Sequence, residues 1–445
     1  MVRRELLTAA VGAAVASCVS SVDRARDHVL RGFVVVDPGR QKAEVRDVYV
    51  VGGKVSLAVP TEGARLPIIE GRGRWLVPGL HDARIASWGN ASPRHCTKLY
   101  QDMGVDTLLK AHLFAGVTQV VVGVGTGKHF HEGLRRVELM KIASAQVKWA
   151  CRGLCAHADD PPGAVCVDSP REVAPALQAE IAEGGSYVQI HYSEMQRPVL
   201  PPVSKDVLRE ALAFAKSVGR ASWVTVGTWA EVEDAVALGA TLVQGLPAGE
   251  PPADLLAHMT EKDIFLAPTL GVLDMGDPLT QDPALDDPLT LPLVRQDVRQ
   301  SYRDLSLYEG YAKTLFEMSG SMRALARQTL QRCDEANVKL VVATDSGWSP
   351  GAFQGVAVHR SLYWMGWAGL RAWSRILAAT LWPARILGAE KPLEDGSAAN
   401  FAVLTDDPLQ QTYEHSSVEA VCLRGRWLDR DSLRPDLVRR PYYPR

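Results

Sequence analysis

The sequence predicts an α/β fold built as a closed (β/α)8 barrel, with short strands before and after it. Apolar runs of strand length alternate with helical stretches about eight times between residues 76 and 395. Parallel strands need helical crossovers, so this alternation favours a parallel barrel. The composition, 47% hydrophobic and 22% charged, is that of an ordinary globular protein. The formal net charge of −2 and the lack of a long run of one sign argue against a nucleic-acid partner.

Short strands are expected in residues 28–75 and again in residues 396–440. Turn signals divide the apolar runs of the first region, and Gly52-Gly53 between two such runs is typical of a hairpin. Pro67 confines the last strand of this region to an edge or shortens it. The expected strands are residues 30–36, 45–51, 54–59 and 66–70 in the first region, and 398–404 and 418–423 in the second.

The central region supplies the barrel elements. Residues 117–124 form a continuous apolar run, which is typical of a strand buried on both faces. Residues 170–183 carry Ala and Leu at the spacing of an amphipathic helix. The expected strands are residues 80–86, 117–124, 149–157, 187–191, 222–228, 241–244, 265–270 and 338–344. The expected helices include residues 170–183, 205–218 and 229–238, with two more at 370–377 and 379–387.

The start of the central region carries a family resemblance. Pro78-Gly79-Leu80, followed by Asp82, is similar to the Pro-Gly-Leu-x-Asp-x-His-x-His segment that enters the barrel of the amidohydrolase superfamily, in its imidazolonepropionase and prolidase branch. The resemblance covers nearly the whole chain from about residue 28. It implies a barrel over residues 76–395 beside a small β-sandwich built from both chain ends, residues 28–75 and 396–440.

The resemblance implies a divalent metal, zinc or another, held by histidines and carboxylates at the barrel mouth. This sequence departs from the family at most of those positions. Arg84 and Ala86 stand in place of two histidines, Gln189 in place of a carboxylated lysine, Gly227 and Gln244 in place of two more histidines, and only the aspartate, Asp345, matches. An amide or a glycine cannot replace imidazole, and Arg84 puts a permanent positive charge where the cation would lie. The sequence therefore predicts no metal cofactor.

An ion pair between Arg84 and Asp345 is the expected replacement. The first and eighth strands are neighbours in a closed barrel, and arginine is the best bidentate partner for a buried carboxylate. Gln189, His191 and Gln244 complete the expected pocket, which would take a small-molecule ligand. The alternative is that Arg84 turns to solvent and Asp345 only caps the following turn.

Two classes of function follow. The first is a pseudoenzyme, a non-catalytic protein that uses the barrel mouth for binding or protein contacts. The second is a hydrolase of amide or cyclic-amide C–N bonds with a displaced or single metal, in which Asp345 keeps its catalytic position. A relocated metal site would use some of the remaining histidines, which are His81, His129, His131 and His191. Serine catalysis through Ser346 or Ser193 is disfavoured, because neither lies on a sharp strand-to-helix turn.

Two other motifs favour structural roles. The glycine-rich stretch at residues 123–127 follows a strand as a phosphate-binding loop does, but it lacks the full spacing, so a tight loop is favoured. Cys151 and Cys155 with nearby His157 lack the second ligand pair of a zinc site. Buried structural cysteines are therefore favoured over a metal clip.

Residues 276–336 do not fit a plain strand–helix unit, since a loop rich in Pro and Asp continues into a long amphipathic helical region. In the family such an insertion follows the sixth strand and covers the barrel mouth. The resemblance therefore implies a lid. A helix that only packs against the barrel is the alternative.

The first eighteen residues resemble a bacterial export signal. Arg3-Arg4 precede an uncharged apolar run at residues 6–16, which is too short to span a bilayer. Residues 15–18 are similar to a lipobox, in which Cys18 would carry the lipid, and the paired arginines suggest the twin-arginine route. We expect a lipid-anchored protein of the cell envelope that touches the membrane only through its anchor. A cytoplasmic protein is the alternative.

The other six cysteines allow fifteen disulfide connectivities, so no pairing is assigned from the sequence. Members of the family are often dimeric, so a homodimer is one alternative, and the sequence leaves the oligomeric state open.

Overall fold

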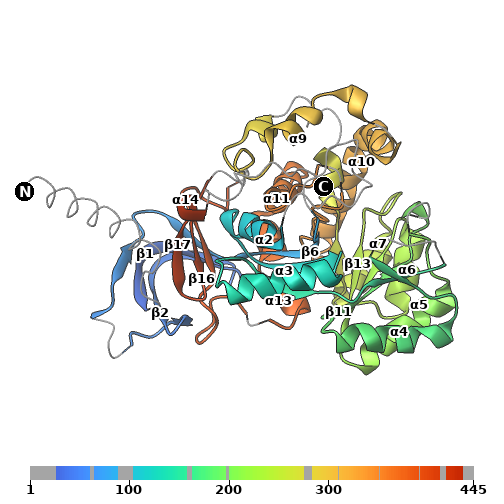
Figure 1. Ribbon diagram of the computed structural model, residues 1–445, viewed down its shortest axis with the longest axis horizontal. Helices are drawn as coiled ribbons and strands as arrows, with labels where there is room; N and C mark the ends of the chain where they lie inside the picture. The colour runs from blue at the N-terminus through green and yellow to red at the C-terminus, as the bar shows by residue number, and fades with distance from the viewer. Residues whose placement is uncertain are drawn as a thin grey trace, which may run out of the picture.

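The computed structural model describes residues 27–60, 65–88, 104–157, 163–196, 200–274, 283–308, 310–349, 351–389, 391–410 and 417–433. Cys18 and the rest of the expected export signal lie outside these residues, as does Cys96. Figure 1 shows a sheet made by both chain ends on one side, and parallel strands with their helices on the other. Among the described residues, no helix is both long enough and apolar enough to cross a bilayer.

The sheet of the two chain ends has eight strands. They are β1 (His28–Asp37), β2 (Lys42–Val51), β3 (Lys54–Ser56), β4 (Ile68–Glu70), β5 (Trp75–Pro78), β15 (Phe401–Leu404), β16 (Val418–Leu423) and β17 (Arg426–Asp429). Their order is β17-β16-β15-β5-β1-β2-β3, and β4 pairs with β1. Strand β5 is central, since it pairs in parallel with β1 and antiparallel with β15. The N- and C-terminal regions therefore share one hydrogen-bonded sheet, whereas the family resemblance implies a β-sandwich built from both chain ends.

This sheet has a separate hydrophobic core, and its buried side chains include Phe33, Leu76, Phe401 and Trp427. At the edge of the sheet, the β2–β3 hairpin turns through Gly52 and Gly53, whose φ angles of 58° and 79° are favourable for glycine. A Cβ at Gly53 would also lie 2.6 Å from the Arg424 carbonyl oxygen. Position 53 therefore requires glycine, and the hairpin that the sequence predicts at Gly52-Gly53 is confirmed.

Nine parallel strands form two further sheets. One has the order β6 (Leu80–Ala86), β7 (Val117–Val124) and β8 (Gln146–Trp149). The other has the order β10 (Ala164–Cys166), β9 (Gly153–Cys155), β11 (Tyr187–His191), β12 (Ala221–Thr225), β13 (Leu242–Gln244) and β14 (Phe265–Ala267). The helices that follow these strands are α2 (Val105–Phe114), α3 (Lys128–Leu139), α4 (Pro170–Ala182), α5 (Lys205–Ser217), α6 (Trp229–Ala237) and α7 (Ala253–Glu261).

Two segments carry backbone hydrogen bonds from one parallel sheet to the other. The strand expected at residues 149–157 is divided, since Ala150 N–H donates to Val122 O of β7 and Cys151 N–H to Tyr187 O of β11, both at 2.9 Å. The segment expected as a strand at residues 338–344 is bridged to β14 at Leu340, and Ser346, just after it, is bridged to β6.

The interruption of the second segment has a local cause. The Thr344 N–H donates to the Asp82 side chain instead of a backbone carbonyl. Asp345 then has a φ of 54°, which leaves the extended conformation. The parallel α/β architecture is thus confirmed, but within the described ranges the strands form two sheets and not one continuous closed barrel.

One buried cluster takes side chains from six of the parallel strands and from residues 341 and 343, with Tyr187 and Trp223 stacked at 4.4 Å between ring centroids. Three of the same strands carry buried polar side chains one or two residues after a member of this cluster, which are Arg84 of β6, Gln189 of β11 and Gln244 of β13.

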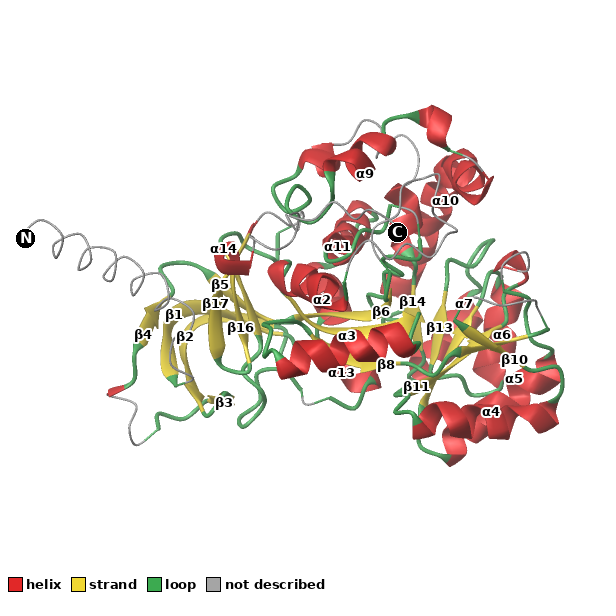
Figure 2. Cartoon of the chain, in the orientation of Figure 1, coloured by secondary structure: helices red, strands yellow, loops and turns green. Residues whose placement is uncertain are grey.

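The remaining elements follow β14. They are η4 (Leu270–Asp274), η5 (Pro283–Asp286), α9 (Gln296–Ser301), η6 (Leu305–Leu307), α10 (Gly310–Glu335), α11 (Val356–Trp367), α12 (Ala372–Ala379), α13 (Leu381–Ile386) and α14 (Arg430–Leu433). Figure 2 shows α9, α10 and α11 gathered on one side of the parallel strands. The predicted helical character of the insertion is confirmed over its described residues, while its action as a lid stays a prediction.

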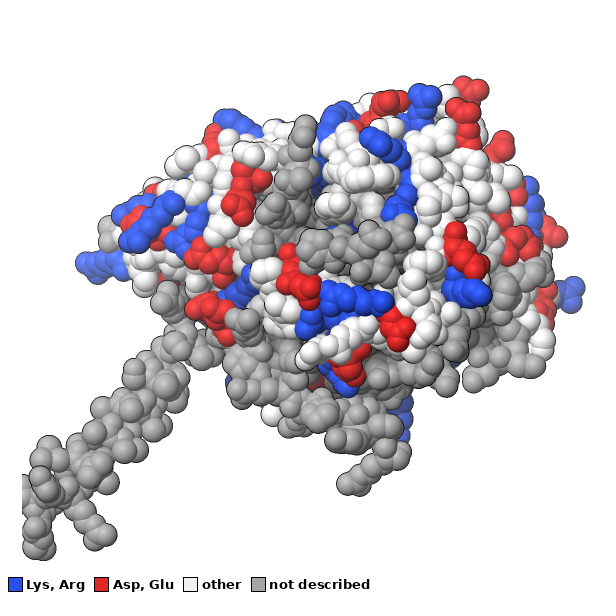
Figure 3. Space-filling view, turned by 90° about the horizontal axis from the view of Figure 1, so that it is seen from above, with Lys and Arg blue, Asp and Glu red and all other residues white. Residues whose placement is uncertain are grey.

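Basic and acidic side chains are interspersed on the face drawn in Figure 3. Neither sign forms a broad patch among the described residues of that face.

Candidate functional site

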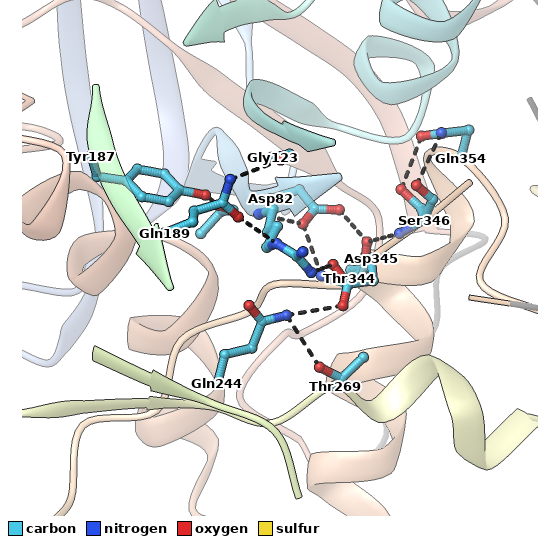
Figure 4. A network of polar contacts seen from close by, with 12 residues as sticks. Asp82, Gly123, Tyr187, Gln189, Gln244, Thr269, Thr344, Asp345, Ser346 and Gln354 are labelled. Carbon is cyan, nitrogen blue, oxygen red and sulfur yellow. Dashed lines mark hydrogen bonds and ion pairs between the residues drawn. The ribbon is translucent and has the colours of Figure 1, made fainter. Parts of the chain in front are cut away.

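Four polar side chains from distant parts of the chain meet at the carboxyl ends of the parallel strands. Arg84 of β6 forms an ion pair with Asp345, and its Nε donates to Gln189 Oε1 of β11 at 2.9 Å. Gln244 of β13 donates through Nε2 to the other carboxylate oxygen of Asp345, also at 2.9 Å. Figure 4 shows Gln189, Gln244 and Asp345 converging in this way. The predicted ion pair is confirmed, and the alternative of a solvent-facing Arg84 is wrong.

Gln189 is held in one orientation. Its Nε2 donates to the carbonyl oxygens of Gly123 and Cys151, at 2.8 and 2.7 Å. Both amide hydrogens are therefore used, and Oε1 is turned toward Arg84. A Cβ at Gly123 would lie 2.7 Å from Arg84 Cγ and 3.1 Å from Gln189 Oε1. The first glycine of the glycine-rich stretch thus makes room for the arginine.

A second carboxylate, Asp82, fixes the segment that carries Asp345. It lies two residues before Arg84 on β6, and the Arg84 N–H donates to Asp82 Oδ1 at 3.4 Å. The Thr344 N–H donates to Asp82 Oδ1 at 3.0 Å and the Thr344 hydroxyl to Oδ2 at 2.6 Å. Asp82 is part of the family motif in the sequence, but no spacing there indicated that it binds the residue before Asp345.

The two carboxylates differ from ordinary surface aspartates. Burial raises the pKa of Asp82 to about 7, against the opposing effect of its Thr344 hydrogen bonds, and the negative charge of Asp345 adds to the increase. Burial also raises the pKa of Asp345, while Arg84 and Gln244 oppose that shift by stabilising the charged form. Arg84 is thus a cation next to two buried carboxyl groups, those of Asp82 and Asp345.

The network is closed to solvent. The exposed fractions are 5% for Arg84, 4% for Gln189, 3% for Gln244 and 5% for Asp345. A ligand could touch these groups only after the surrounding chain moves. The arrangement is therefore a buried polar network and not an open substrate site.

These residues do not fit a divalent metal as they are arranged. Asp345 already binds a guanidinium, and the two nearby amides offer one neutral oxygen donor each. A divalent cation at a catalytic site is normally held by three or more imidazole, thiolate or carboxylate groups. Within the described ranges, no three His, Cys, Asp or Glu side chains come close enough to share a metal ion. That statement includes the Cys151, Cys155 and His157 group and the four remaining histidines of the relocated-metal alternative.

His191 and Gly227 are two further positions that the sequence analysis singles out. His191 is buried at the end of β11, where a Cβ added to Gly153 of β9 would lie 2.3 Å from its Nε2. The Gly227 N–H donates to Glu231, whose side chain also completes the capping box of α6. Gly227 therefore belongs to a helix start and contributes no side chain to the site.

The structure gives Ser346 a structural partner. Its hydroxyl donates to Gln354 Oε1 at 2.9 Å, and His112 Nε2 lies 2.8 Å from the same oxygen. Gln354 thus separates the serine from the histidine, and burial lowers the pKa of His112 to about 4. The Gln354 amide also donates to the carbonyls of Ala86 and Trp88. No sequence pattern pointed to this cluster.

Comparisons with known proteins bear on the fold. No protein-family model matches the sequence, and no curated protein matches it either. Solved structures do match. A prolidase complexed with N-methylphosphonate-L-proline is 19% identical with a TM-score of 0.69, covering 91% of this chain and 99% of its own. A Xaa-Pro dipeptidase with bound methionine is 16% identical with a TM-score of 0.68, covering 91% and 100%. Molinate hydrolase is 15% identical with a TM-score of 0.69, covering 94% and 98%.

The chain has the amidohydrolase fold. The resemblance seen in the Pro78-Gly79-Leu80 segment is therefore confirmed at the level of fold. Identities of 15–19% do not carry an activity from the neighbours to this chain. The function must be argued from the site that this amidohydrolase fold holds.

Proposed function

We propose that this chain is a non-catalytic protein of the amidohydrolase fold, in which the Arg84–Asp345 ion pair takes the place of a divalent cation. The observation that supports this proposal is the position of the guanidinium, which contacts Asp345 and Gln189 at once. The family resemblance implies catalysis by a metal that lowers the pKa of a bound water to about 7. A guanidinium has no open coordination position and stays protonated, so it cannot activate water in that way.

The barrel is proposed to close through the two linking segments. Residues 150–151 join β7 to β11, and residues 339–346 join β14 to β6 through backbone hydrogen bonds. In that arrangement the ion pair ties the first strand to the eighth. Gln189 and Gln244 tie it further to β11 and β13. The proposed role of the network is to stabilise the mouth of the barrel, above which a small-molecule ligand or a protein partner binds.

A hydrolase of amide or other C–N bonds is the second candidate, and the names of the structural neighbours favour it. They include a prolidase, a Xaa-Pro dipeptidase and molinate hydrolase. For this candidate Arg84 must leave Asp345, so that the carboxylate can hold a single metal. The residues present as arranged do not fit that role, which is why the first candidate is preferred.

Metal content and activity measured together separate the two candidates. The full chain is purified without chelator, dialysed against Zn²⁺ or Mn²⁺, freed of excess metal and analysed for bound elements. We expect far less than one metal ion per chain and no hydrolysis of prolyl dipeptides or N-acyl amino acids. About one metal per chain, lost together with hydrolysis in Asp345→Asn, would establish the hydrolase instead. Glu419→Gln, a surface change in the terminal sheet, is the control.

The cellular location is also proposed, not observed. Arg3-Arg4, the apolar run at residues 6–16 and Cys18 support export and lipid anchoring. Cys18→Ser should move the protein from the membrane fraction to the soluble envelope fraction and abolish labelling by a fatty-acid analogue. An unchanged distribution in that variant would contradict the anchor. Chain association as a homodimer is tested separately by light scattering.

A further inference from the structure

Two cysteines lie side by side at the edge of the six-stranded parallel sheet. Cys155 ends β9, Cys166 ends β10, and the two are direct partners in the parallel register. Partners on neighbouring strands lie about 4.8 Å apart, within the range of Cα separations of about 4.4–6.8 Å that disulfides use. Their sulfur atoms are 4.0 Å apart. Both are thiols in this structure.

The surrounding backbone holds this geometry. Val167 N–H donates to the carbonyl of Cys155 at 2.9 Å, which extends the pairing of the two strands beyond the cysteines. Gly153↔Ala164 and Leu154↔Val165 continue the register on the other side. The sulfur atoms, 4.0 Å apart, must approach to about 2.0 Å to form the bond.

We propose that Cys155 and Cys166 form a reversible disulfide that pins the edge strand β10 to β9. The other described cysteines have different surroundings. Cys151 and Cys333 are buried, and Cys422, also buried, donates to the Ala399 carbonyl in the terminal sheet.

The order of the chemical steps follows from exposure. Cys155 is fully buried, whereas Cys166 is partly exposed. Burial raises the pKa of the Cys155 thiol to about 12, so it is not the first nucleophile. With a small disulfide such as oxidised glutathione as oxidant, the Cys166 thiolate attacks one sulfur and releases one glutathione thiolate. Cys155 then loses its proton, attacks the Cys166 sulfur and releases the second glutathione. The protein loses two electrons and two protons, and the small disulfide gains them.

The disulfide would stabilise the edge of the six-stranded sheet. Strand β10 has three residues and lies at a sheet edge, where few hydrogen bonds retain it. The disulfide would close the chain between residues 155 and 166 and so stabilise the fold against unfolding. Strand β9 also carries Gly153, against which His191 packs. Oxidation of the pair would therefore restrain the strand that packs against His191.

The test uses the full chain in two redox states. One sample is treated with dithiothreitol and the other with excess oxidised glutathione, and both are alkylated and mapped by mass spectrometry. We expect the oxidised sample to contain a peptide pair linked through Cys155 and Cys166 and to melt at a higher temperature. Cys166→Ser should lose both effects, whereas Cys96→Ser should keep both.

Three outcomes would overturn the proposal. The first is alkylation of both cysteines after oxidation. The second is a glutathione adduct that persists on Cys166 without resolution by Cys155. The third is a linkage of Cys166 to another cysteine. Because the wild-type chain is compared with itself, a variant that folds poorly does not obscure the result.

Discussion

Replacing Arg84 by Met tests the ion pair directly. The substitution keeps most of the side-chain volume and removes the charge, which leaves Asp345 buried at 5% exposure without its cation. Removing one member of a buried ion pair typically costs about 3–5 kcal/mol, mostly because the other charge stays buried without compensation. We expect the unfolding free energy of the Arg84→Met variant to fall by about that amount.

The expected change in melting temperature follows from the size of the unit that unfolds. Unfolding entropy is about 2.1 cal/mol/K per residue. For the roughly 320 residues between positions 76 and 395 this corresponds to about 0.7 kcal/mol/K. A loss of about 3–5 kcal/mol then lowers the melting temperature by about 4–7 °C. Differential scanning calorimetry at pH 8 is the assay.

The double variant Arg84→Met/Asp345→Asn provides the control. Asn tolerates the positive φ of 54° at position 345 and removes the uncompensated charge, so most of the lost stability should return. The single variant should also lose less stability at pH 5 than at pH 8. Its Asp345, with a raised pKa, takes up a proton in the folded state as the pH falls. A single variant that melts within about 1 °C of wild type, or a double variant as unstable as the single, would refute the reasoning.

Three further predictions follow. Gly123→Ala places a Cβ 2.7 Å from Arg84 Cγ and should lower the free energy of unfolding by about 1–3 kcal/mol, measured by calorimetry. Gly127→Ala is the matched control, because a Cβ there meets nothing within 4 Å. Equal effects of the two substitutions would contradict the packing argument. Asp82 has a folded-state pKa of about 7, above its unfolded value, so its contribution to stability is complete below about pH 4 and is lost as the pH rises through 7. Asp82→Asn should flatten the fall in melting temperature between pH 5 and pH 8, and an unchanged slope would count against the raised pKa. Thr344→Val removes a hydroxyl donor from Asp82 and should steepen that same fall, whereas Thr405→Val, at a surface position, should not.

The sequence contained enough information to predict the parallel strands, the terminal strands and the ion pair. The pair could be predicted because only one expected ligand, Asp345, was retained and Arg84 occupied the facing position on the first strand. Burial of an isolated Asp345 would be costly, which made a cationic partner the reasonable expectation.

Other features depend on side-chain and backbone interactions that have no periodic signal. The hydrogen bonds from Thr344 to Asp82 and the positive φ at Asp345 interrupt the expected eighth strand, and neither follows from propensity. Gly123 belonged to a stretch that resembled a phosphate loop, yet the structure uses it to accommodate Arg84. The Ser346–Gln354–His112 cluster joins residues far apart in sequence and carries no motif.

Anomalous X-ray diffraction at the zinc absorption edge tests the central claim most directly. Crystals of the full chain are grown and soaked with Zn²⁺, and a difference map is calculated around Asp345. We predict a guanidinium in contact with the carboxylate and no anomalous peak beside it. A peak within about 2.2 Å of an Asp345 carboxylate oxygen, with Arg84 displaced, would contradict the proposal that an arginine has replaced the cation.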